Sequence, residues 1–299
     1  MKSRILGIST VLLFTAVGTA SAQQIFTVSQ FMQHNFILNP AAAGADAKGS
    51  VGATYRKMWT SMPGGPQTTL VYADRYFDKR KTGVGVVIFD DKTGPTSRTG
   101  ARINLSYSIP LKPGSRLMMG LGGQVMQFRI NKNEFAQYIP NDPLLASSGT
   151  TVKGDAAAGI YYQSNTLNLG VSVQQLLQSK LNLIKSSTNP EGKLYRHLYV
   201  IGSYNIRTDE SNLLIPNFQC QFVPGLPADI SGGVRLEHKE LVWVGFNYHH
   251  NQSYSAFAGV KVKQQLAIGY AFDQYSTPLS LFDGGSGAHE ISLRYFIQK

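Results

Sequence analysis

Apolar and polar residues alternate with a period of two along nearly the whole chain, and this pattern constrains the fold more than any other feature. After residue 48 about fourteen such runs follow one another. The clearest runs are 101–109, 167–174, 228–236 and 265–272. Lipid on one face and an aqueous lumen on the other require this alternation, although a soluble β-sandwich shows it too.

The connections between the runs tend to alternate between short and long. Short turns are predicted near 78–80, 110–115, 164–165, 209–211, 237–239 and 263–264. Longer loops are predicted at 59–67, 90–98, 130–152, 175–193, 222–227, 249–252 and 273–288. Short turns at one end and longer loops at the other are typical of outer-membrane barrels. The sequence therefore predicts an all-β fold, a closed antiparallel transmembrane β-barrel of about 14 strands.

The first residues have the features of a secretion signal. Lys2 and Arg4 precede the apolar stretch 5–17, which is too short to span a bilayer, and 20–22 form an Ala-Ser-Ala cleavage site. We expect a signal peptide at 1–22, an N-terminal segment at 23–47, and a barrel at 48–299 in the outer membrane.

Charge and residue spacing argue against several classes of function. The chain is basic, with a formal net charge of +11, but it has no basic helix or aromatic RNA-binding motif, so nucleic acid is not expected as a partner. A basic lumen or contacts with outer-membrane lipid head groups fit the scattered Lys and Arg better. The single Cys220 excludes an internal disulfide, and the six histidines lack metal-site spacing. No enzyme activity, cofactor or metal is predicted.

The segment from residue 23 to 48 has no sustained alternation. It carries six large apolar residues: Phe26, Phe31, Met32, Phe36, Ile37 and Leu38. Asn39-Pro40-Ala41-Ala42-Ala43-Gly44 follows and predicts a turn. A barrel of about 14 strands has a wide lumen, so this segment is interpreted either as a plug inside it or as a flexible leader.

Ordered motifs along the chain resemble one family. Ser29-Gln30-Phe31-Met32 precedes Leu38-Asn39-Pro40, Tyr55-Arg56-Lys57-Met58-Trp59 precedes Gly65-Pro66, and the chain closes with His289-Glu290-Ile291-Ser292-Leu293-Arg294-Tyr295. This set is similar to the PorP/SprF family of the Bacteroidetes type IX secretion system. Met58 stands where that family often has Gln, and Ala288 where it often has Ser. The resemblance marks these residues as structural or plug positions: Gln30, Phe31, Asn39, Pro40, Gly44, Tyr55, Arg56, Trp59, His289 and Glu290.

The resemblance implies a role in secretion or surface anchoring of a large partner with a C-terminal sorting domain, and contact with periplasmic components of the secretion system. The alternative is a transport channel of the FadL or porin type, because FadL-type transporters carry a similar Asn-Pro-Ala element. We expect the long loops to dock the secreted partner. The apolar anchors offered by these loops are Leu144, Leu145, Leu181, Leu183 and Ile184, unless they pack within their own loops.

Overall fold

The computed structural model describes residues 28–46, 49–138, 149–181, 192–276, 279–282, 284 and 287–297, and the expected signal peptide lies outside them. The barrel strands are β1 (Gly49–Met58), β2 (Gln67–Phe77), β3 (Thr82–Thr93), β4 (Thr96–Pro110), β5 (Ser115–Ile130), β6 (Thr150–Ser164), β7 (Leu167–Gln174), β10 (His197–Tyr204), β12 (Asn212–Phe222), β13 (Asp229–His238), β14 (Val242–His249), β15 (Ser253–Val262), β16 (Leu266–Tyr275) and β17 (Ala288–Phe296). The remaining elements are η1 (Phe31–Gln33), α2 (Asn35–Leu38), η2 (Pro40–Ala42), η3 (Asp78–Arg80), α3 (Lys132–Tyr138), the short strands β8 (Lys180–Leu181), β9 (Gly192–Lys193) and β11 (Ile206–Arg207), and α5 (Leu279–Phe282).

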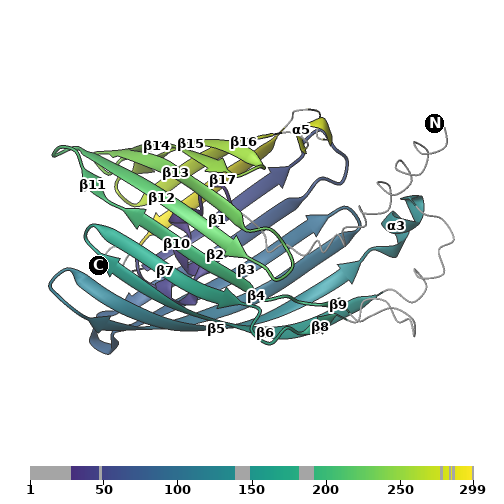
Figure 1. Ribbon diagram of the computed structural model, residues 1–299, viewed down its shortest axis with the longest axis horizontal. Helices are drawn as coiled ribbons and strands as arrows, with labels where there is room; N and C mark the ends of the chain where they lie inside the picture. The colour runs from purple at the N-terminus through teal and green to yellow at the C-terminus, as the bar shows by residue number, and fades with distance from the viewer. Residues whose placement is uncertain are drawn as a thin grey trace, which may run out of the picture.

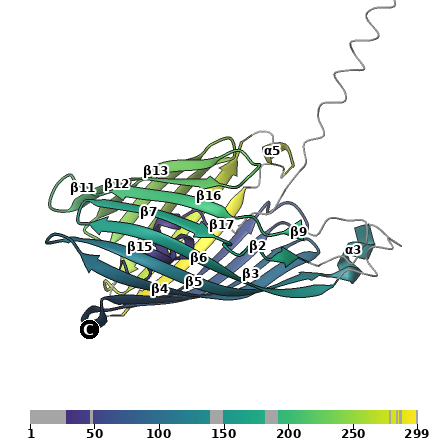
Figure 2. The same cartoon turned by 60° about the horizontal axis from the view of Figure 1, so that its bottom comes forward.

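Antiparallel pairing closes the sheet into a barrel of 14 strands, as the sequence predicts (Figures 1 and 2). Each barrel strand pairs with the next one along the chain, and β1 pairs with β17 to complete the ring. Between β7 and β12 the ring runs through β10, because β8 and β9 form a separate ribbon. Closure is physically required, since an open edge in lipid leaves backbone groups unpaired at a cost of several kcal/mol each.

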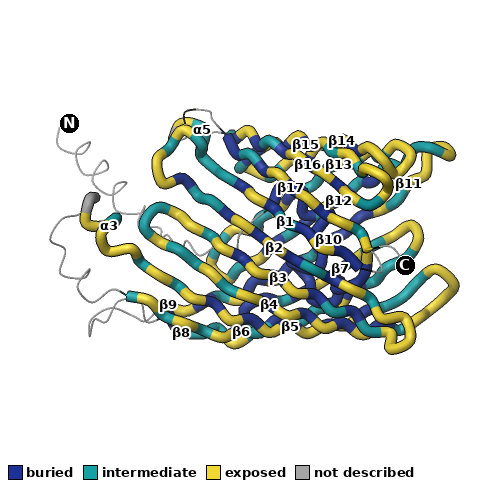
Figure 3. Tube along the Cα trace, turned by 180° about the vertical axis from the view of Figure 1, so that it is seen from behind, coloured by how far each residue is buried: buried dark blue, intermediate teal, exposed yellow. Residues whose placement is uncertain are grey.

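The two faces of each strand differ in burial, as the alternation requires (Figure 3). On β4, Ile103 and Leu105 point outward and are more than half exposed, whereas Arg102 and Asn104 are buried against the lumen. The outward row is the surface that lipid covers. In the chain as described, no helix is long and apolar enough to cross a membrane.

The two ends of the barrel differ. One end, here the turn end, carries the short connections 78–81, 111–114, 165–166, 208–211, 239–241 and 263–265. The opposite end, the loop end, carries 59–66, 94–95, 131–149, 175–196, 223–228, 250–252 and 276–287. In outer-membrane barrels the short turns face the periplasm.

One predicted loop is wrong. Residues 90–98 continue β3 and β4 as a hairpin whose tip is Gly94-Pro95, with Thr93 paired to Thr96. Gly94 supplies the positive φ of 51° that this turn needs. Side-chain pairs such as Arg98–Asp91 at 2.8 Å hold the two strands together. Both faces of this extension are polar, so it lacks the alternation that marks the strands below it.

Residues 28–46, here the plug segment, lie inside the barrel and contain η1, α2 and η2 (Figures 1 and 2). Phe36, Ile37 and Leu38 are buried and belong to the main apolar core. Asn39 caps η2 by accepting a hydrogen bond from the Ala41 N–H, and Pro40 starts that turn. The apolar run and the Asn-Pro step therefore build a compact insert rather than another strand.

Candidate functional site

The ring of barrel strands, here the wall, fixes the plug segment near the loop end through three buried charged side chains: Arg56, Asp273 and Glu290. Glu290 accepts hydrogen bonds from the backbone N–H groups of Ser29 at 2.6 Å and Gln30 at 3.1 Å. The Ser29 hydroxyl donates to Asp273 Oδ2 at 2.9 Å. The two backbone N–H groups thus supply hydrogen bonds that the buried Glu290 carboxylate would otherwise lack.

Strand register brings these three charges together. Arg56 on β1 lies opposite Glu290 on β17, and Asp273 lies on β16, the next strand of the ring. Arg56 Nη2 lies 2.5 Å from Asp273 Oδ2 and Arg56 Nη1 lies 3.5 Å from Glu290 Oε2. Arg56 also donates to the Ser29 hydroxyl. Buried ion pairs need such additional hydrogen bonds to offset the loss of hydration.

In the middle of the lumen the wall recognises the backbone of the plug segment. Four plug carbonyls accept hydrogen bonds from wall side chains: Ile37 from Arg102 at 2.7 Å, Phe36 from Asn104 at 2.8 Å, Ala43 from Ser106 at 2.8 Å, and Leu38 from Ser172 at 2.7 Å. In the other direction, Asn39 donates from Nδ2 to the Ile160 carbonyl at 2.9 Å. The wall therefore satisfies polar groups that the short plug helices leave unpaired.

Glycines in the wall make room for this contact. A Cβ atom at Gly83 would lie 1.9 Å from the Ala43 carbonyl oxygen, and one at Gly120 would lie 2.3 Å from the Ala41 nitrogen. Any larger residue at either position would collide with the plug backbone. These strand glycines allow close backbone approach, one of the two usual roles of glycine in strands.

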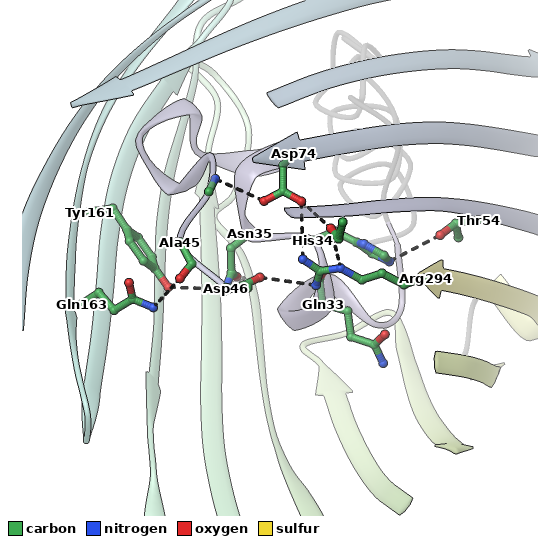
Figure 4. A network of polar contacts seen from close by, with 12 residues as sticks. Gln33, His34, Asn35, Ala45, Asp46, Thr54, Asp74, Tyr161, Gln163 and Arg294 are labelled. Atoms are coloured by element: carbon green, nitrogen blue, oxygen red, sulfur yellow. Dashed lines mark hydrogen bonds and ion pairs between the residues drawn. The ribbon is translucent and has the colours of Figure 1, made fainter. Parts of the chain in front are cut away.

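A second charged cluster fixes the plug segment at the turn end (Figure 4). Arg294 donates to the Gln33 carbonyl at 2.8 Å and lies 3.5 Å from Asp46 and 3.7 Å from Asp74. Asp74 also accepts from the Gly44 N–H at 3.2 Å.

His34 lies between these contacts on the plug segment and is fully buried. Its Nε2 lies 3.4 Å from the Thr54 hydroxyl, and its ring packs edge-on against Tyr72 at 4.8 Å. Burial, and secondarily the nearby Arg294, lowers the pKa of His34 to about 3. The docked imidazole is therefore neutral near pH 7.

Contacts of the plug segment reach from near the loop end of the barrel to the turn end. Ser29 is bound by Arg56, Asp273 and Glu290, each two residues from the strand end that faces the loops. The Ala45 carbonyl instead accepts from Arg116 and Gln163, each one residue from the turn end. The plug segment thus contacts the barrel strands at both of these levels.

Most of the residues marked by the family resemblance meet at this interface, but three do not. Gln30, Phe31, Asn39, Pro40, Gly44, Arg56 and Glu290 lie in the plug segment or contact it. Tyr55 points outward, and His289 accompanies it on the outer face with Nδ1 at 2.6 Å from the Tyr270 hydroxyl. Trp59 follows β1 with a φ of 50°.

Sequence reasoning missed several residues that hold the plug segment: Asp273, Arg294, Asp74 and Arg102. The available signal was a charged residue at a lumen-facing position of an alternating strand. Of the five proposed docking residues, Leu181 is buried in the main apolar core, and Leu144, Leu145, Leu183 and Ile184 lie outside the described residues. No group of His, Cys, Asp or Glu in the described ranges is suited to hold a metal ion.

Comparisons with known proteins give one family match and several structures of similar fold. Residues 20–295 match the family described as "Type IX secretion system membrane protein PorP/SprF". The CymD monoaromatic hydrocarbon channel is similar in structure, with a TM-score of 0.53 and 10% identity, covering 94% of this chain and 96% of that one. Omp33 of Acinetobacter baumannii gives a TM-score of 0.48 at 9% identity, covering 84% and 98%. No curated protein is similar enough to this sequence to match it.

Proposed function

Because this chain belongs to the PorP/SprF family and is an outer-membrane component of type IX secretion, we propose that it is a closed platform that supports secretion or surface anchoring of a partner. The partner we propose is a large protein with a C-terminal sorting domain. The barrel would hold this partner through its loop end and contact periplasmic components of the apparatus through its turn end.

The observation that carries this proposal is the plug segment, which is bound inside the lumen from near the loop ends of β1, β16 and β17 to the turn ends of β5 and β6. It is held by buried charges at both ends and by backbone hydrogen bonds between them. A transport channel needs a lumen or a lateral path that a solute can enter. An insert held at many points inside the barrel instead favours a rigid scaffold, whose loops carry the binding function.

The loop end offers exposed apolar side chains for docking. Leu177, between β7 and β8, is 66% exposed, and Leu281 on α5 is 76% exposed. Large apolar side chains of this kind contribute strongly to interfaces when a partner buries them. They replace Leu181 as the described candidates, since Leu181 is buried in the main apolar core.

The test is affinity purification of the tagged barrel from native outer membranes, followed by mass spectrometry. We expect a protein with a C-terminal sorting domain to be retained, and the double change Leu177→Asp with Leu281→Asp to lower its yield. Leu241→Asp is the matched control, because Leu241 is exposed on a turn at the opposite end. Retention of no such protein, together with porin-like conductance of the intact barrel, would favour the channel.

A further inference from the structure

A recess of about 690 Å³ opens at the turn end of the barrel, beside the end of the plug segment. Ala45, Tyr76, Arg116 and Gln163 line its inner part, and the β4–β5 turn with Lys112 and Pro113 forms its rim. Ser108, which also lines it, is buried on the lumen face of β4. The recess therefore opens through the mouth of the lumen, and a ligand reaches it from the periplasm rather than from the bilayer.

Arg116 is held in a fixed position inside this recess. Its Nε and Nη2 atoms donate to Gln163 Oε1 at 2.8 and 2.6 Å, and Nη2 also donates to the Ala45 carbonyl at 2.9 Å. The guanidinium group lies 4.6 Å over the ring of Tyr76. Within the described part of the chain, Nη1 makes no hydrogen bond, so its two N–H groups are free to bind an acceptor.

A guanidinium group with these features suits a carboxylate ligand. Arginine is a cationic side chain whose planar donors match the geometry of a carboxylate. Because packing and hydrogen bonds already fix its orientation, ligand binding costs little further side-chain entropy. The aromatic ring beneath it and the nearby Pro113 add apolar contact for the stem of a peptide side chain.

The rim around the recess is basic. The adjacent turns 78–81 and 111–114 carry four Lys or Arg residues and a single acid, Asp78. These turns lie side by side, since the Ser108 N–H donates to the Lys81 carbonyl at 2.8 Å. The four basic side chains are exposed, which raises the local concentration of acidic groups that approach from the periplasm.

We propose that this recess binds an acidic peptide segment of a periplasmic component of the secretion apparatus, with Arg116 binding one of its carboxylates. This proposal rests on the proposed function, because it names the surface through which the platform meets its periplasmic partner. The basic rim supplies charge complementarity, and the volume and lining accommodate a short extended segment rather than a folded domain.

The test uses the full-length barrel in detergent and a fluorescein-labelled peptide of alternating Glu and Gly, followed by fluorescence anisotropy. We expect saturable binding that weakens with added salt, and no binding of the matched Gln-Gly peptide. Arg116→Met should weaken binding about tenfold, and Arg116→Lys should weaken it less, because the charge remains while the planar donors are lost. Lys263→Met is the control, since Lys263 is exposed on the turn 263–265, no residue of which lines the recess.

Lys112→Glu keeps the proposal testable if Arg116 variants lose the Ala45 contact and fail to fold. This change on an exposed turn should weaken binding of the Glu-Gly peptide and favour a Lys-Gly peptide. The proposal is overturned if Arg116→Met and Lys112→Glu bind like the wild type, or if phosphatidylglycerol micelles compete for the Arg116-dependent site more strongly than the peptide. Intact peptide binding without any captured sorting-domain protein would instead refute the proposed function and leave this site standing.

Discussion

Removing the Glu290 carboxylate tests how the plug segment is held. Glu290 is fully buried and accepts from the N–H groups of Ser29 and Gln30. In Glu290→Ala both groups lose their acceptor inside the barrel, and each unsatisfied buried donor costs about 1–3 kcal/mol. Docking of the plug segment is therefore weakened by about 2–6 kcal/mol, which raises the population of undocked plug roughly 30-fold to 25,000-fold.

Hydrogen exchange of the peptide that covers 28–46, read by mass spectrometry in detergent, measures this change. Exchange should accelerate by the same factor if docking and undocking are fast relative to exchange. Glu290→Gln should give a smaller effect, because one amide oxygen still accepts. Ile291→Ala, the outward neighbour on β17, is the control and should leave exchange unchanged. Wild-type exchange in Glu290→Ala would refute the assigned anchoring role.

Three further changes follow from the same geometry. Val171→Arg places a charge on the lipid face at a cost of about 2–4 kcal/mol and should prevent assembly of the barrel, seen as loss of heat-modifiable migration. Ser172→Arg, on the lumen face, should leave the barrel assembled and displace the plug segment. Equal loss of assembly in the two variants would mean that the faces are misassigned. Gly83→Val should likewise release the plug from a closed barrel, because its Cβ collides with the Ala43 carbonyl, and unchanged exchange of 28–46 would contradict that contact. The pKa of His34 is about 3 when the plug segment is docked and about 6.5 when it is free, so protonation favours the undocked state, and lowering the pH from 7 to 5 should weaken docking roughly 20- to 30-fold. His34→Gln should remove this part of the pH dependence. An identical pH profile in that variant would show that another group is responsible.

Alternation in the sequence predicts the strands because lipid and lumen impose opposite demands on neighbouring residues. Leu169 and Val171 point outward and Ser172 points inward, as the pattern indicates. The same argument fails for 90–98, where the hairpin forms the loop ends of β3 and β4 and both of its faces are polar. Without opposed environments, a polar strand and a polar loop look alike in sequence.

The interface of the plug segment was predictable only in part. The apolar run and the Asn-Pro element indicate an insert or a leader, and hydrogen bonds from Arg102 and Asn104 to its carbonyls are what distinguish the two. Resemblance to the family marks Arg56 and Glu290, but their partner Asp273 depends on the register of β16, β17 and β1. Alternation shows which side chains face the lumen and carries no information on how a segment without periodicity folds among them.

Conductance in planar lipid bilayers tests most directly whether this barrel is a closed platform. The full-length protein should show no steady conductance, because the plug segment lies inside the lumen and is bound to strands on several sides of it. A variant lacking 28–46 should remain heat-modifiable and conduct strongly. An intact barrel that conducts like a wide porin, with no increase on deletion, would contradict the closed-platform account.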